Sequence, residues 1–385
     1  MVGGAVGDAL GYAVEFEHWP SIERKYGPKG ITRYELGPRG KALISDDTQM
    51  ALYTANGILL GMTRGCLRGI MARPDNYCIH SYLDWLASQD ALPADTKVHR
   101  ASWLKHVPEL HARRAPGNTC LTALASVARK QPVNNNSCGC GGVMRTAPIA
   151  LICAEHCYAD GSILKADLVA AEAARITHKH PLGFIPSAIL NHILMLMMYC
   201  HEEPQPRLEH FVEEALKAVP EILSEEDHGK PYKELWPQHL DTQRELIEKA
   251  LELAGTDIPD HNAIEQIGGG WTGHEALAIA VYSAVKHQES FEDAIVCSVN
   301  HSGDSDSTGA VCGNIMGCFL GRNAIPANFT RDLELCDVIE EMSEDIYTGC
   351  IVSDHDFNMT PEKIRWEKKY VKMFWEPPIC FFNDF

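Results

Sequence analysis

Glycine recurs at every fourth residue near both ends of this sequence, and this spacing restricts the fold more than any other feature. Residues four positions apart share one face of an α-helix. The spacing occurs in two segments of small and apolar residues, at Gly3, Gly7 and Gly11 and at Gly309, Gly313, Gly317 and Gly321. A glycine inside a helix costs about 1 kcal/mol relative to alanine, and close contact with another backbone can offset that cost. We therefore predict that helices at residues 1–16 and 309–321 cross at short distance in the core.

The rest of the sequence is dominated by helical periodicity. Long apolar–polar alternation, the pattern of half-buried strands, is nearly absent, which predicts an all-α class. The clearest helical patterns lie at residues 48–64, 120–129, 164–176, 189–199, 275–286 and 291–298. Two further amphipathic patterns, at about 208–218 and 239–254, belong to a polar and acidic segment. We interpret that segment, about residues 201–262, as a peripheral helical insertion in a single domain of residues 1–350.

Composition limits the classes of partner. Of the 385 residues, 45% are hydrophobic, which is enough for a sizeable core. The net charge of −18, from 34 basic and 52 acidic residues, argues against binding to nucleic acid or to an anionic membrane. No uncharged apolar run reaches the roughly 18 residues of a membrane span. The 14 cysteines, in a sequence without a secretory-signal pattern, favour free thiols and a cytoplasmic location.

The segment 351–385 is unusually aromatic, and we treat it as a C-terminal extension of the domain. Its large aromatic residues include Trp366, Tyr370, Phe374, Trp375, Phe381, Phe382 and Phe385. So many apolar side chains are not expected to remain in water. We predict that the extension packs on the rest of the chain or on a partner.

Two acidic turns, far apart in the chain, each precede a helical pattern. The first is Ser45–Thr48, with two adjacent aspartates, and the second is His301–Gly309, with Asp304 and Asp306. Carboxylates this close repel one another unless a cation lies between them, and hard divalent cations prefer oxygen ligands. Together the turns offer enough carboxylates and hydroxyls for a two-metal site of the Mg²⁺ or Mn²⁺ type. Ordinary helix capping or a surface turn explains either stretch alone about as well.

A glycine-rich stretch, Asn134–Pro148, opens another helical pattern. Its backbone N–H groups could hold a diphosphate at a helix N-terminus, although it lacks the Walker A and Rossmann sequences. A turn that simply allows close packing is about as good an explanation. The nearby pairs Cys138/Cys140 and Cys153/Cys157 lack the spacing of a zinc site, so we expect inert thiols.

Taken in this order, the stretches resemble the ADP-ribosylglycohydrolase family. The matching segments are Gly7–Gly11 with Glu15, Ser45–Met50, Gly141–Pro148, Thr177–Pro181, Gly269–Leu277 and His301–Ser307. The resemblance covers roughly residues 1–345. It implies a single orthogonal all-helical bundle with two Mg²⁺ or Mn²⁺ ions in a central cleft.

The resemblance also implies roles for individual residues. The implied metal ligands are Ser45, Asp46, Asp47, Asp304, Asp306 and Ser307. Glu15 would lie near the ribose as a gate or proton-transfer group, and Asp304 is the other candidate for proton transfer. The implied substrate contacts are Asn118, Gly141, Gly142, Met144, Arg145, His178, Trp271, His301, Ser302 and Gly303.

The implied activity is metal-dependent hydrolysis of ADP-ribose from a modified protein, with ADP-ribosyl-arginine the expected linkage. Cleavage at the ribose anomeric carbon develops oxocarbenium character, and two metals can bind the ribose diol and orient a water. Some arginine-directed members carry an aspartate before the Gly-Asn-Thr turn, where this chain has Ala115 and Pro116. Another carboxylate would then have to transfer the proton.

Three alternatives stay open on the sequence. The chain could hydrolyse another ADP-ribose linkage, on serine, a nucleobase or a small molecule. It could instead be an immunity or antitoxin protein that neutralises a cognate ADP-ribosyltransferase by binding it, with the aromatic extension as the contact. A metal phosphatase is the third alternative.

Overall fold

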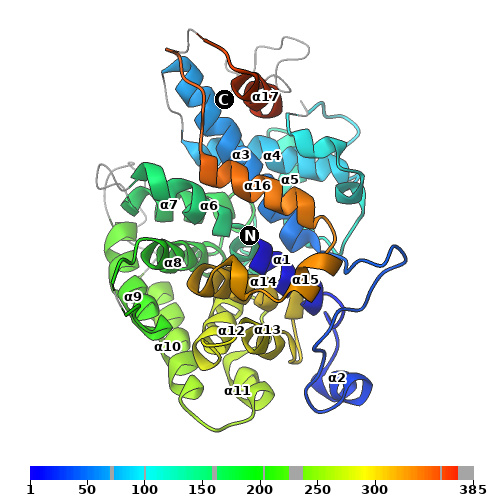
Figure 1. Ribbon diagram of the computed structural model, residues 1–385, viewed down its shortest axis with the longest axis vertical. Coiled ribbons are helices and arrows are strands. Elements are labelled where there is room, and N and C mark those ends of the chain that lie inside the picture. Colours follow the sequence, from blue (N-terminus) through cyan, green and yellow to red (C-terminus); the bar gives the residue numbers. More distant parts are fainter. Residues whose placement is uncertain are drawn as a thin grey trace.

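A computed structural model describes residues 1–69, 73–98, 101–157, 163–202, 204–224, 237–355 and 358–371 (Figure 1). Over these ranges the regular elements are 17 α-helices and four short 3-10 helices, without a β-strand. Two isolated bridges, Ala42–Leu333 and Gly139–Thr272, pair short extended segments. The prediction of an all-α class is confirmed.

The helices follow one another along the whole chain. The first eight are α1 (Val2–Gly11), α2 (Trp19–Tyr26), α3 (Asp46–Arg68), α4 (Pro74–Ser88), α5 (Asn118–Ala128), α6 (Ala147–Cys157), α7 (Ile163–Arg175) and α8 (Pro181–Met198). The others are α9 (Leu208–Ser224), α10 (Pro237–Ala254), α11 (Asp260–Ile267), α12 (Gly273–Lys286), α13 (Phe291–Val299), α14 (Ser305–Leu320), α15 (Ala327–Asp332), α16 (Cys336–Thr348) and α17 (Pro361–Tyr370). The 3-10 helices are η1 (Trp103–His106), η2 (Pro108–His111), η3 (Cys140–Arg145) and η4 (Arg322–Ala324).

Helices α1 and α14 cross in backbone contact near the centre of the molecule (Figure 1). A β-carbon added at Gly7 would lie 1.9 Å from the carbonyl oxygen of Gly309, and one at Gly3 would lie 2.3 Å from that of Gly313. Real β-carbons do not approach this closely, so the crossing requires glycine. The predicted close crossing is confirmed, and every residue of α1 is buried.

The glycine spacing of α14 does not have one function throughout. A β-carbon at Gly317 would stand 3.5 Å from Gly3, an ordinary contact distance, and one at Gly321 would meet nothing within 4 Å. Gly321 has a φ of +80° and follows the last residue of the helix. Gly309 and Gly313 therefore allow the close crossing with α1, whereas Gly321 ends the helix.

Helix α8 is longer than the sequence pattern predicted. We expected it to begin at Ile189, but Pro181 occupies its first turn and Pro186 lies inside it. The helix reaches 18 residues with a mean hydropathy of 1.5, so by length and composition it could cross a membrane, contrary to our expectation. However, 83% of this helix is buried inside the protein. Core helices of globular proteins can be equally long and apolar.

The segment interpreted as a peripheral insertion contributes apolar side chains to the main core. Phe211 and Val212 of α9 and Ile247 of α10 are buried within the same hydrophobic cluster as α8 and α12. Helix α11, which the sequence pattern did not predict, closes this region against α12. In Figure 1 the helices α9 to α13 fill the lower part of the view.

The described part of the aromatic extension packs on the body of the protein. Trp366 and Tyr370 of α17 are buried, and the Trp366 indole donates a hydrogen bond to Thr63 Oγ1 on α3 at 2.9 Å. The prediction that the extension packs back is confirmed for this helix. Phe374, Trp375 and the aromatic residues after them lie outside the described residues.

The α1–α14 crossing yields a stability prediction with a control on the same two helices. Gly7→Ala places a methyl group against the Gly309 carbonyl oxygen, and overpacking of this kind costs about 1–3 kcal/mol. Gly317→Ala meets ordinary contact distances, so we expect it to be neutral or to stabilise by up to about 1 kcal/mol. Urea unfolding of both variants measures the difference in their free energies of unfolding. Equal stability would contradict the backbone contact.

Candidate metal and substrate site

The two acidic turns lie at the N-termini of α3 and α14. Ser45 is the N-cap of α3, and its Oγ accepts a hydrogen bond from Asp47 N at 3.1 Å. Asp304 is the N-cap of α14, and its Oδ1 accepts from Ser307 N at 3.3 Å. The helix-capping explanation is therefore correct for both turns. It does not exclude a shared site, because Asp46, Asp47, Asp304 and Asp306 also line one cavity.

Helix α1 holds both turns in place. The Asp8 carboxylate accepts hydrogen bonds from Ser45 N at 3.0 Å and from Thr48 N at 3.1 Å, and Thr48 Oγ1 also donates to it. Less than one turn further along α1, at its last residue, a β-carbon on Gly11 would lie 2.2 Å from the carbonyl oxygen of Ser305. No role was predicted for Asp8, whose only sequence signal is its place as an aspartate within a run of small residues.

The cavity between the turns has a volume of about 340 Å³. The predicted site residues that line it are Glu15, Asp46, Asp47, Asn118, Gly141, Met144, His178, Trp271, Asp304, Asp306 and Ser307. The N-terminus of α5 forms one side, and Gly117 N donates to Asp46 Oδ2 at 3.3 Å. The structure thus brings together residues from seven separate segments at one cavity.

Acidic side chains dominate the electrostatics of the cavity. Burial, followed by repulsion from Asp304 and Asp46, raises the pKa of Glu15 from 4.5 to about 8. Burial also raises the pKa of Asp46 to about 8 and that of Asp47 well above its usual range. Among the residues that line the cavity, none is a lysine or an arginine. The cavity thus buries several carboxyl groups without a compensating cationic side chain, and their raised pKa values reflect the cost of ionising them there.

This donor set suits a hard divalent cation. Glu15 Oε2 and Asp47 Oδ2 are buried without a hydrogen-bond partner, and a cation would satisfy both their charge and their lone pairs. Among the described residues, however, no three carboxylates of the site bring oxygens within 4.8 Å of one another. The carboxylates therefore surround the cavity as an open ring.

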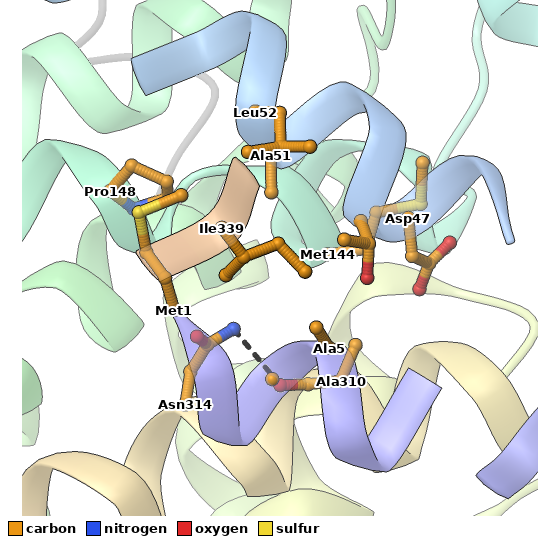
Figure 2. Close-up of a pocket in the computed structure, with 12 residues that line it drawn as sticks. Met1, Ala5, Asp47, Ala51, Leu52, Met144, Pro148, Ala310, Asn314 and Ile339 are labelled. Atoms are coloured by element: carbon orange, nitrogen blue, oxygen red, sulfur yellow. Dashed lines mark hydrogen bonds between the residues drawn. The ribbon is translucent and has the colours of Figure 1, made fainter. Parts of the chain in front are cut away.

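A second, smaller cavity of about 20 Å³ lies behind Asp47 (Figure 2). Asp47 and Met144 line both cavities, and Ala5, Ala51 and Ile339 give the small one a mostly apolar wall. Its volume is sufficient for about one water molecule. Asp47 thus lies between the two cavities.

Arg145 is not exposed to the cavity, contrary to the prediction that it contacts substrate. The side chain is fully buried, and its guanidinium donates to Thr177 Oγ1 at 2.6 Å and to the Ala173 carbonyl oxygen at 3.2 Å. It also lies 4.6 Å from the centre of the Tyr82 ring. Arg145 therefore supports the cavity wall from behind.

Thr177 connects Arg145 to His178 in the cavity wall. Its Oγ1 accepts from Arg145 and lies 2.9 Å from His178 Nδ1 and 3.4 Å from the Ala174 carbonyl oxygen, so its single proton has two acceptors within reach. Burial and the nearby Arg145 lower the pKa of His178 to about 3, so the ring is neutral. His178 thus presents a neutral imidazole at the cavity wall.

Four other predicted contacts also lie behind the wall. His301 Nε2 interacts with Thr308 Oγ1 at 2.9 Å, and Ser302 Oγ accepts from Trp19 N at 2.9 Å. Gly303 packs on Gly269, where a β-carbon would lie 1.9 Å from the carbonyl oxygen, and Gly142 packs as tightly on the backbone of α8. Ser45, a predicted metal ligand, does not line the cavity either and acts as a helix cap.

The glycine-rich stretch is a close-packing turn. Cys140 N donates to the Trp271 carbonyl oxygen at 3.2 Å, and Gly139 N donates to Ser137 Oγ at 3.3 Å, so these N–H groups already have partners. A β-carbon at Gly142 would lie 2.2 Å from the Gly183 carbonyl oxygen. The stretch also places a thiol in the site, because Cys140 Sγ lies 2.8 Å from Asp304 Oδ2. The described thiols are free, as predicted.

Two stacked aromatic rings lie at the mouth of the cavity. The rings of Phe16 and Trp271 are 5.5 Å apart, nearly parallel, and largely exposed at 65% and 44%. Phe16 has a φ of +68°, which is unfavourable for a side chain of this size. This conformation directs the residue after Glu15 toward Trp271. The resulting pair offers a flat apolar surface beside the acidic ring.

Comparison with known proteins identifies the family. Residues 1–356 match the ADP-ribosylglycohydrolase family. The chain belongs to this family. It is 23% identical over 381 residues to ADP-ribosylhydrolase ARH1 of Dictyostelium discoideum, covering 90% of this chain and 92% of that protein. It is 26% identical over 354 residues to the ADP-ribosyl-[dinitrogen reductase] glycohydrolase of Rhodospirillum rubrum, covering 87% and 89%.

A solved structure shares the fold of this family member. It is titled "ADP-ribosylglycohydrolase-related protein complex" and matches with a TM-score of 0.57 at 23% identity. The match covers 90% of this chain and 94% of the solved one. The similarity therefore extends over the whole helical body.

The raised pKa values predict that the cation-free protein loses stability as pH rises. A carboxyl group with a higher pKa in the folded state favours folding below its unfolded pKa, and this contribution is lost as pH rises through the folded value. For Glu15 and Asp46 the window runs from about 4 to about 8. We expect a lower Tm at the upper end in chelator, with Mn²⁺ raising Tm most there. Asp46→Asn should reduce both effects, and a Tm indifferent to Mn²⁺ would contradict the assignment.

Substitution of Asp8 tests whether α1 positions the first acidic turn. Asp8→Ala leaves the N–H groups of Ser45 and Thr48 without their acceptor, and unsatisfied buried donors cost about 1–3 kcal/mol each. We expect lower stability in urea and weaker Mn²⁺ binding by calorimetry. Asp8→Asn keeps one oxygen acceptor, so its stability and Mn²⁺ affinity should lie between those of the native protein and Asp8→Ala. Unchanged Mn²⁺ affinity in Asp8→Ala would contradict the positioning role.

Proposed function

We propose that this protein is a divalent-cation-dependent hydrolase that releases ADP-ribose from ADP-ribosyl-arginine on a modified protein. Family membership supports ADP-ribose hydrolysis, and the name of the Rhodospirillum relative specifies an ADP-ribosylated protein as the substrate of that protein. The single observation that carries the proposal here is the ring of buried carboxylates around a cavity that no lysine or arginine lines. An anionic ligand can enter such a ring only when bound cations neutralise the carboxylates.

The residues proposed to hold two Mg²⁺ or Mn²⁺ ions are Asp46, Asp47, Asp304, Asp306 and Ser307. Bound there, the ions would supply Lewis-acid chemistry, which polarises oxygens and lowers the pKa of water. The chain supplies the positions, because both helix N-termini are fixed through α1. Ser45 is retained in this proposal as a residue that orders the turn.

Glu15 is the better of the two candidates for proton transfer. Asp304 accepts from Ser307 N through Oδ1 and from Cys140 Sγ through Oδ2, so both oxygens are engaged. Glu15 Oε2 is buried without a hydrogen-bond partner, so this oxygen is available to accept a proton. In the proposed reaction water adds to the anomeric carbon, the carbon–nitrogen bond breaks, and Glu15 moves a proton from the water toward the leaving nitrogen.

One feature of the cavity favours a different linkage as the second candidate. Ala115 and Pro116 form the wall ahead of Asn118, where they offer no carboxylate to a guanidinium group. A substrate linked through a hydroxyl or a small leaving group needs no such partner. A panel of proteins and small molecules carrying different ADP-ribose linkages decides between these substrates by the relative rates of ADP-ribose release.

The decisive experiment measures free ADP-ribose released from arginine-modified protein, with and without Mg²⁺. Glu15→Gln should reduce kcat by about 10²- to 10⁴-fold, the usual contribution of a general acid–base group, while calorimetry shows Mn²⁺ binding retained. Asp46→Asn and Asp306→Asn should lose both Mn²⁺ binding and turnover. Full activity of the two aspartate variants would overturn the proposed site.

A further inference from the structure

Outside the acidic cavity, three metal-ligating side chains converge from three different helices. Asp260 is the first residue of α11, His287 follows the end of α12, and Cys297 lies on α13. One donor atom from each lies within 4.8 Å of the other two. Among the described residues this is the one group of three acidic, histidine or cysteine side chains that meets so closely.

The chemistry of these donors differs from that of the acidic ring. A thiolate, an imidazole and a carboxylate form a borderline-soft set that suits Zn²⁺, whereas Mg²⁺ and Mn²⁺ prefer oxygen. A thiolate and a carboxylate together neutralise the charge of Zn²⁺. Cys297 is buried, while Asp260 and His287 are partly exposed, which leaves a path for the ion and room for a water as fourth ligand.

Hydrogen bonds around the group orient the carboxylate. Tyr282 OH donates to Asp260 Oδ1 at 2.8 Å, and the Lys286 ammonium lies 3.9 Å from the same oxygen. Oδ2 faces His287, whose Nε2 lies 3.0 Å away. One carboxylate oxygen is thus held from outside, while the other points to the imidazole, as expected of a metal ligand and its supporting hydrogen bonds.

A purely hydrogen-bonded anchor for α11 accounts for part of this arrangement. The bonds from Tyr282 and His287 would serve that purpose without a metal. The buried Cys297 thiol also hydrogen-bonds to Asp260 and Ser283, so it takes part in the same network. A bound ion would replace these contacts by ligating all three side chains at once.

The position of the group connects it to the cavity mouth. The next residue of α11, His261, stacks on Trp19 with ring centres 4.6 Å apart, and Trp19 N donates to Ser302 of the acidic turn. At the other end of α11, Gly268 begins the glycine segment that leads to Trp271. An ion that fixes α11 would therefore stabilise both segments that flank the mouth.

We propose that Asp260, His287 and Cys297 form a structural Zn²⁺ site that joins α11, α12 and α13. Binding exchanges the Cys297 thiol proton for the ion, with no change in oxidation state. The site is independent of the proposed hydrolase activity, because none of its ligands lines the acidic cavity. It adds a second, chemically distinct metal to the protein.

Cobalt provides the test, because a Co²⁺–thiolate bond gives a near-ultraviolet charge-transfer band that Mg²⁺ sites lack. The whole protein is stripped with a chelator and titrated with Co²⁺ in excess Mg²⁺. We expect one equivalent to bind with this band, and Zn²⁺ to displace it. Cys140→Ser should keep the band, since that thiol lies at the acidic cavity, and Cys312→Ala, a buried thiol on α14, should keep it too. Cys297→Ser should abolish it.

A second variant keeps all three ligands and covers the case in which Cys297→Ser fails to fold. Tyr282→Phe removes only the hydrogen bond to Asp260 Oδ1, and loss of such a supporting bond weakens metal binding by about 10- to 100-fold. We expect the Co²⁺ band to remain with this loss of affinity. An absent band in the native protein, a band that survives Cys297→Ser, or an unchanged affinity in Tyr282→Phe would each overturn the proposal.

Discussion

The contact between α1 and α14 is the constraint on which the rest of the structure depends. Because Gly7 meets the backbone of Gly309, the two helices have one possible separation and one register. That register sets Asp8 against the first acidic turn and Gly11 against the second. The last turn of one buried helix thus contacts two acidic turns that lie far apart in the sequence. The open ring of carboxylates follows from this arrangement.

The ring is electrostatically unfavourable by itself, and the helices reduce that cost. Three helices, α3, α5 and α14, begin at the cavity, and the N-terminus of a helix carries partial positive charge that favours nearby carboxylates. Backbone N–H groups of Gly117 and Ser307 donate to two of the aspartates. These interactions are short-ranged and fixed. They hold the carboxylates in place but leave the pKa of Asp46 and Glu15 high, so the folded chain remains suited to binding added positive charge.

The sequence predicted what depends on composition and short spacing, and failed where three-dimensional packing decides. Glycines four apart within an apolar helical pattern indicated close backbone contact, so the crossing was predictable, although Gly321 proved to end its helix instead. Arg145 and His178 both belong to recognisable segments, yet one supports the wall and the other faces the cavity, because only the packing of η3 on α7 and α8 separates them. Helix α11 is eight residues long, too short for a clear periodic pattern. The metal content of the ring and the boundary of the insertion stay predictions.

The proposed substrate and the proposed cations must bind cooperatively. ADP-ribose carries two negative phosphates, and the cavity it would enter is lined by five carboxylates, Glu15, Asp46, Asp47, Asp304 and Asp306, with a neutral His178 and no lysine or arginine. Repulsion opposes entry of the anion alone. Cations in the ring reverse the local field, so each species raises the affinity of the other by the same factor. The aromatic pair Phe16–Trp271 then offers the uncharged part of such a ligand an apolar surface outside the ring. In this proposal, cation binding is a condition for substrate binding as well as for chemistry.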